Sequence, residues 1–318
     1  MTTNQTTILK MKIFKNFWSE RFKKIMSIMI LTTFTISLIG LVLFEELAMP
    51  YMPISPWKRT SALTPADYGL RADSLVLAVE KALILRGYFI HANTPKPKAT
   101  LILLHGIGGF KEGYLTFSKI LADEGYNVVI YDQRGHGTSD GKYCTFGYYE
   151  KQDVSKFIDF INKQCPNLPV GVHGASMGGA VALQALAFDK RLKFGIVEST
   201  FNSLEDVVIE YGRGYFKFRS RWLAQRVLSK SAVIAQYKPF EIKPVESCAH
   251  IEQPILLVHG DSDEKIPMTF NKQNFDALKS KDKEFYIING AGHDNVGEIG
   301  GQVYLDKILT FIKRQVKL

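Results

Sequence analysis

The chain has 318 residues, 46% of them hydrophobic and 22% charged, which is typical of a globular protein with one large domain or two small ones. The formal net charge is +9, but six Lys or Arg against one Glu in residues 1–24 account for +5 of it and leave +4 for the rest. This distribution does not indicate a nucleic-acid partner. The three cysteines form no Cys-x-x-Cys motif and no His/Cys cluster, so we expect neither a metal nor a cofactor.

The N-terminal part of the sequence predicts a membrane anchor. Residues 25–44 carry no charge, and a helix of that length spans about 30 Å, the thickness of a bilayer core. Basic residues precede this run, while Glu45 and Glu46 follow it, so the positive-inside rule predicts a single-pass protein with a cytoplasmic N-terminus and an exported body. The alternative is a secreted protein released by signal cleavage. The length of the apolar run and the lack of an A-x-A site favour the uncleaved anchor.

The predicted domain order follows from this anchor. We expect a basic cytoplasmic segment at 1–24, a transmembrane signal-anchor helix at 25–44, a Pro-rich linker at 45–69 and a folded domain at 70–318.

The folded part alternates between predicted strands and helices. Short apolar runs predict strands at 74–80, 83–92, 99–106, 126–132, 168–174, 193–200, 253–261 and 283–290. Helical spacing appears at 113–125, at 148–164, after residue 176 and at 304–315. The first two strands are expected to form an antiparallel edge pair. The others predict an α/β fold with a mostly parallel sheet and helices on both faces. Residues 201–252 interrupt the alternation and predict a small helical cap above the carboxyl ends of the strands.

The stretch VGVHGASMGGA at 170–180 places Ser176 in a G-x-S-x-G pattern between a strand and a helix. A nucleophile in this position needs a sharp turn, and Gly174 and Gly178 remove the side chains that would collide there. Because this pattern also occurs by chance in structural turns, Ser176 is a candidate nucleophile only if the rest of the chain supplies a base and an acid.

The base and the acid are expected in later loops. His293 lies in the Gly-rich loop before the last helix, and Asp263 lies beyond the strand at 253–261. Glu198, at the end of the preceding strand, is the alternative acid, while Asp261 is expected to bond turn backbone. Among the other histidines, we expect the ring of His173 to pack beneath the turn. His105, His136 and His259 each precede a glycine, where a ring more often orders backbone.

An oxyanion hole needs two backbone N–H donors. Met177, directly after the serine, can supply one. The Gly-rich stretch LLHGIGGFKEG at 103–113 offers Ile107 as the second candidate.

Five motifs, LLHGIGG, YDQRGHGTSDG, GVHGASMGG, LLVHGDSDEKIP and GAGHDN, together resemble the serine-hydrolase branch of the alpha/beta-hydrolase superfamily, which contains monoacylglycerol lipases and esterases. The resemblance covers about residues 70–318. It implies a catalytic triad of Ser176, Asp263 and His293, and structural roles for Asp132 and Arg134.

The expected activity is hydrolysis of a carboxylic ester or thioester, with a small-molecule or lipid ester as substrate. The anchor and the aromatic and basic residues at 211–222 favour a lipid. A serine aminopeptidase-like peptidase and a non-catalytic membrane-tethered binding protein are the alternatives.

Overall fold

The computed structural model describes residues 3–316, and the chain divides into two compact units between Tyr51 and Met52. The first unit consists of helix α1 (Thr3–Leu47) and the short 3-10 helix η1 (Met49–Tyr51). The most apolar 18-residue window of this region has a mean hydropathy of 2.3, and its side chains are not buried. A helix of this length and composition is compatible with a membrane anchor or with a signal sequence.

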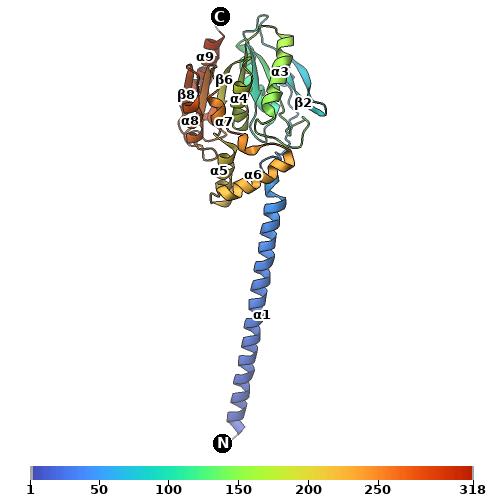
Figure 1. Ribbon diagram of the computed structural model, residues 1–318, viewed down its shortest axis with the longest axis vertical. Helices are drawn as coiled ribbons and strands as arrows, with labels where there is room; N and C mark the ends of the chain where they lie inside the picture. Colours follow the sequence, from blue (N-terminus) through green and yellow to red (C-terminus); the bar gives the residue numbers. More distant parts are fainter. Residues whose placement is uncertain (1–2, 317–318) are drawn as a thin grey trace. The chain divides into compact units, whose positions relative to one another are not determined.

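The second unit is built on an eight-stranded sheet in the order β1-β2-β4-β3-β5-β6-β7-β8 (Figure 1). The strands are β1 (Ala72–Glu80), β2 (Leu83–Ile90), β3 (Thr100–Leu104), β4 (Asn127–Tyr131), β5 (Val170–Ala175), β6 (Leu192–Glu198), β7 (Ile255–Gly260) and β8 (Lys283–Ile288). β1 and β2 are antiparallel to their neighbours, and all the other pairings are parallel. This arrangement confirms the predicted α/β fold with its antiparallel edge pair.

Helices cover both faces of the sheet (Figure 1). One face packs against α3 (Glu150–Gln164), α4 (Met177–Phe188), α7 (Pro244–Cys248) and α8 (Met268–Ala277). The other packs against α2 (Leu115–Asp123) and α9 (Val296–Gln315). The central strands β3, β4 and β7 are buried throughout, because helices remove both of their faces from water.

The segment between β6 and β7 holds the cap, which consists of α5 (Leu204–Phe216), α6 (Arg221–Ala235) and the short η4 (Pro239–Glu241), and then α7, which packs on the sheet. Serine side chains start the two longer helices: Ser203 accepts from the Asp206 N–H, and Ser220 accepts from the Leu223 N–H. Apolar side chains of α5 and α6 share a buried cluster with Met177 at the start of α4, so the cap packs directly on the turn that carries Ser176.

The structure differs from the sequence-based expectation in three places. Helix α8 was not predicted, because its amphipathic segment is short and rich in polar residues. The last helix begins at Val296 rather than at residue 304, and it is kinked at Gly301, whose φ is 53°. Part of the expected linker belongs to the second unit: Ile54 is fully buried, and Lys58 donates to the Ser139 carbonyl at 2.7 Å.

Candidate active site

Ser176 lies at a strained turn between β5 and α4. Its φ of 55° and ψ of −119° fall in a region that residues with side chains rarely adopt, at a cost of about 1–3 kcal/mol. Two glycines permit the turn: a Cβ on Gly174 would lie 2.2 Å from the Gly178 carbonyl oxygen, and a Cβ on Gly178 would lie 2.0 Å from the Leu104 carbonyl oxygen. The chain therefore holds the Ser176 hydroxyl at the carboxyl edge of the sheet, next to the end of β3.

The structure brings His293 and Asp263 to this serine from two separate loops. His293 Nε2 lies 3.0 Å from Ser176 Oγ, and His293 Nδ1 lies 2.7 Å from Asp263 Oδ2. Since a carboxylate only accepts hydrogen bonds, Nδ1 carries the ring proton and Nε2 is free to accept the serine proton. The three predicted side chains thus form one continuous hydrogen-bonded line from the acid to the hydroxyl.

Asp263 is held in its ionised form. Burial opposes ionisation, but contacts from His259 and His293 and the Ile266 N–H outweigh it and keep the pKa of Asp263 well below its usual range. Its second oxygen accepts the N–H groups of Lys265 at 2.9 Å and Ile266 at 2.8 Å. A fixed negative charge at this point orients the imidazole and stabilises its protonated form.

The two candidate oxyanion donors lie beside the serine. Gly106 approaches so closely that a Cβ there would be 3.2 Å from Ser176 Cβ, which places Ile107 in the loop next to the nucleophile. Met177 is the first residue of α4, where a backbone N–H has no intrahelical acceptor. Within residues 3–316 neither N–H donates to another protein group, so both are available to a ligand.

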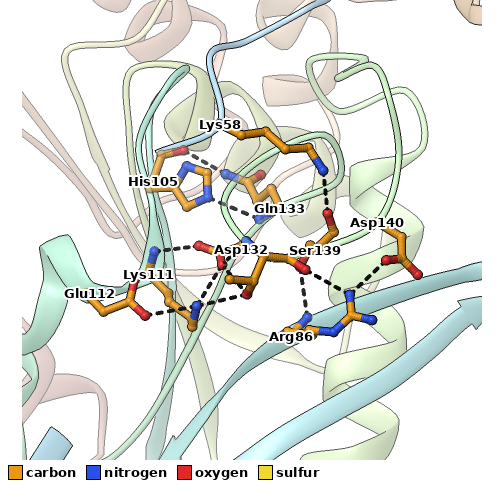
Figure 2. A network of polar contacts seen from close by, with 10 residues as sticks. Lys58, Arg86, His105, Lys111, Glu112, Asp132, Gln133, Ser139 and Asp140 are labelled. Carbon is orange, nitrogen blue, oxygen red and sulfur yellow. Dashed lines mark hydrogen bonds and ion pairs between the residues drawn. The ribbon is translucent and has the colours of Figure 1, made fainter. Parts of the chain in front are cut away.

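A buried polar network fixes both ends of the loop that carries Ile107 (Figure 2). At one end, Gln133 donates its side-chain amide to the His105 carbonyl at 2.7 Å and its backbone N–H to the His105 ring at 3.1 Å. Burial, and then the neighbouring His136, lower the pKa of His105 to about 3, so this ring is neutral and can accept. At the other end, the Lys111 ammonium lies 2.8 Å from Asp132 and 2.9 Å from Glu112.

Asp132 and Arg134, expected to be structural, both form buried ion pairs. Asp132 also accepts the N–H of Lys111 and of Thr138, each at 2.8 Å. Arg134 donates to both oxygens of Asp153, at 2.7 and 2.8 Å, and to Glu80 at 3.0 Å. These contacts tie the loop after β4 to its neighbours and not to the serine.

The alternative acids make other contacts. Glu198 lies 2.6 Å from His173 Nε2 and accepts from the Tyr304 hydroxyl. The ring of His173 packs against Tyr114 and Phe117, beneath the turn as expected. Asp261 does bond backbone, but it accepts the Gly290 N–H of the loop after β8 at 2.7 Å.

Sequence reasoning missed one side chain at this site. His259 was expected only to order backbone, and its Nε2 does lie 3.0 Å from the Ile266 carbonyl. The same nitrogen also lies 3.2 Å from Asp263 Oδ2, so the acid has an imidazole on each side. The four-residue spacing between His259 and Asp263 is present in the sequence. The two side chains come into contact only because the loop after β7 folds back on the end of the strand.

Comparison with known proteins agrees with this fold. Residues 95–243 match the Hydrolase_4 family, described as serine aminopeptidase, S33. An esterase from Pyrococcus furiosus, Pf2001, superposes with a TM-score of 0.70 at 25% identity, over 83% of this chain and 98% of that one. The chain belongs to the alpha/beta-hydrolase superfamily. The matched family range contains Ser176 but ends before Asp263 and His293, so these two residues rest on the geometry described above.

Other relatives and a further solved structure extend the similarity. The uncharacterized protein YqkD of Bacillus subtilis is 28% identical over 66% of this chain and 68% of its own length. The uncharacterized protein YfhR of Escherichia coli is 25% identical over 92% of this chain and 95% of its own length. An acylaminoacyl peptidase of Pyrococcus horikoshii shares the fold, with a TM-score of 0.61 at 18% identity, over 78% of this chain and 42% of that one.

Proposed function

We propose that this alpha/beta hydrolase is a membrane-anchored serine hydrolase that cleaves carboxylic ester or thioester bonds, with lipid or acyl esters as its substrates. The observation that carries the proposal is the line from Asp263 through His293 to Ser176, at 2.7 and 3.0 Å, with the serine on a strained turn. A hydroxyl needs an adjacent base to become a nucleophile, and this arrangement supplies the base and the group that orients it.

The proposed reaction has two halves. In the first, Ser176 Oγ attacks the acyl carbonyl carbon while His293 Nε2 takes the hydroxyl proton and then passes it to the leaving alcohol or thiol. The Ile107 and Met177 N–H groups stabilise the negative oxygen of the tetrahedral intermediate, and Asp263 stabilises the protonated imidazole. In the second half, His293 removes a proton from water, which attacks the acyl-enzyme, and the proton returns to Ser176 Oγ as the acid leaves.

The cap favours an ester over a peptide with a free amine. Its carboxylates could bind an ammonium group, but those of α5 already pair with arginines. Arg221 lies 2.8 Å from Glu205 and 3.4 Å from Asp206, while Glu210 lies 2.8 Å from both Arg213 and Arg219. Apolar side chains instead gather beside the turn, including Met177, Phe201 and Leu204. These surroundings suit an acyl chain. The description of the matched family as a serine aminopeptidase keeps peptidase activity as the second candidate.

The proposed location is a membrane, with the N-terminus in the cytoplasm and the hydrolase domain on the exported side. It rests on the apolar helix α1 and on the basic residues that precede its apolar run. A secreted protein released by signal cleavage is the alternative.

A fluorophosphonate probe, which reacts with activated serines, tests the proposal. We expect the full chain in detergent to be labelled and the Ser176→Ala variant to remain unlabelled. A panel of acyl esters, thioesters and aminoacyl arylamides then separates the two enzymatic candidates. Folded wild-type protein that resists the probe would contradict the serine-hydrolase assignment and favour a tethered binding protein.

A further inference from the structure

A second imidazole contacts the acid of the proposed triad. His259 is the penultimate residue of β7, and its side chain is fully buried; its Nε2 lies 3.0 Å from the Ile266 carbonyl and 3.2 Å from Asp263 Oδ2. Both neighbours of this nitrogen are acceptors, so Nε2 carries the ring proton. The other nitrogen, Nδ1, is buried and has no hydrogen-bond partner in the described chain.

The contact matters because Asp263 Oδ2 is also the oxygen that faces His293, at 2.7 Å. The N–H of His259 offsets part of the negative charge on that oxygen. The more charge the oxygen keeps, the more strongly it stabilises the protonated form of His293. His259 also joins the strand end to Ile266, whose N–H donates to Asp263 Oδ1 at 2.8 Å, so it holds the loop that presents the acid.

We propose that His259 is a positioning residue for the proposed triad. His259 shares Asp263 Oδ2 with His293 and thereby sets the pH at which His293 becomes available as a base. The inference rests on the proposed function. It gives a role to a buried polar side chain that the two-step mechanism does not use.

Other ionisable groups lie near Asp263 and His293, and the variants described below leave these groups unchanged. Lys265 and Asp294, from the two loops, pair with each other. In α5, Tyr211 lies close enough to Asp263 and Asp294 to feel their charge, and burial chiefly raises its pKa to about 12. Arg213 of α5 donates to the Glu264 carbonyl at 3.0 Å. Among the described residues, the contacts of Asp263 Oδ2 are those with His293 and His259, so none of these other groups takes the place of His259.

A matched pair of variants isolates the N–H of His259. Met and Gln have the same length and nearly the same volume, but only Gln can donate from the position of His259 Nε2. The measurement is the rate of fluorophosphonate labelling of Ser176 as a function of pH, made on the full chain in detergent. We expect the acid-side midpoint of this profile to rise by about half a pH unit in His259→Met, because protonated His293 is then stabilised more strongly. The midpoint should stay near the wild-type value in His259→Gln.

Asn271→Leu is the control that separates a general loosening of the end of β7 from the loss of the His259 N–H. Asn271 is buried on α8 and donates to the Val258 carbonyl at 3.1 Å, one residue before His259, without touching Asp263. We expect this variant to label more slowly without a shift of the midpoint. His259→Phe is a second variant without a donor, and it carries the same expectation as His259→Met if the latter does not fold.

Equal midpoints for the wild type and the folded donor-less variants would overturn the inference, as would an equal shift in Asn271→Leu. Wild-type protein without Ser176-dependent labelling would overturn the proposed function and this inference with it. If the wild type shows Ser176-dependent labelling but the midpoint does not move in the donor-less variants, the inference is overturned and the proposed function stands.

Discussion

Gly178→Ala tests whether the close approach of α4 to β3 creates the active geometry. The added Cβ would lie 2.0 Å from the Leu104 carbonyl oxygen and 2.8 Å from the His105 carbonyl oxygen, whereas ordinary contacts begin at 3.4 Å. Both obstacles are backbone atoms, so no side chain can rotate away. The start of α4 and the end of β3 must then separate by about 1.4 Å at the Leu104 contact.

This separation should cost activity more than stability. Overpacking of this kind typically destabilises a protein by about 1–3 kcal/mol. The same movement displaces Met177 from the loop of Gly106 and Ile107, and a misplacement of about 1 Å in a catalytic constellation can lower the rate about 100-fold. We therefore expect a protein that is still folded but labels with a fluorophosphonate about 100-fold more slowly.

The assay combines labelling rate with thermal unfolding, and Gly212→Ala is the control. Gly212 lies in α5, and a Cβ there would meet nothing within 4 Å, so alanine should leave the labelling rate unchanged and stabilise the helix slightly. Wild-type labelling and melting temperature in Gly178→Ala would refute the reasoning, because the sheet and the turn would then tolerate the added methyl group.

Four further predictions follow from the same contacts. Asp263→Asn should lower turnover about 1,000-fold or more in a folded protein, measured as kcat for an aryl ester, because the amide cannot hold His293 in the required orientation and tautomer. Because the pKa of Asp263 is lowered on folding, the contribution of its carboxylate to stability is complete above pH about 4 and is lost at lower pH. The unfolding free energies of the wild type and of Asp263→Asn should therefore converge on acidification, and a difference that grows instead would contradict this. Lys111→Met should lower the unfolding free energy by about 3–5 kcal/mol, measured by thermal or denaturant unfolding, because the buried Asp132 carboxylate loses its ion-pair partner. Lys119→Met, which removes an exposed ion pair, should change the unfolding free energy little, and equal effects of the two variants would be inconsistent with a buried network. After alkaline carbonate extraction the full chain should remain in the membrane pellet with its N-terminal peptide intact, and a soluble form without α1 would instead indicate signal cleavage.

The sequence predicted most of the sheet because its strands are short, apolar and separated by helices. The spacing around Ser176 and the positions of Asp263 and His293 after successive strands also sufficed to place all three at one edge, since parallel strands end together. Helix α8 escaped prediction because it buries little apolar surface, and among its side chains the polar Asn271 and Asn274 are the buried ones.

Contacts between distant loops could not be predicted in the same way. The distance from His259 to Asp263 depends on how the loop after β7 folds back to Ile266, and no periodic pattern encodes that turn. The pairing of Glu198 with His173 depends on the register of β5 and β6 and on the kinked helix that brings Tyr304 to it. Local patterns specify elements, while side-chain partners at their ends depend on tertiary structure.

Trapping of the acyl-enzyme shows directly whether Ser176 is the nucleophile. The wild-type chain would be mixed with an activated aryl ester, quenched in acid within the first turnover, digested with trypsin and examined by mass spectrometry. We expect the mass of one acyl group on the peptide 164–190, which contains Ser176, and none in Ser176→Ala. Ester hydrolysis that proceeds in Ser176→Ala, or an acyl group on another residue, would contradict this expectation.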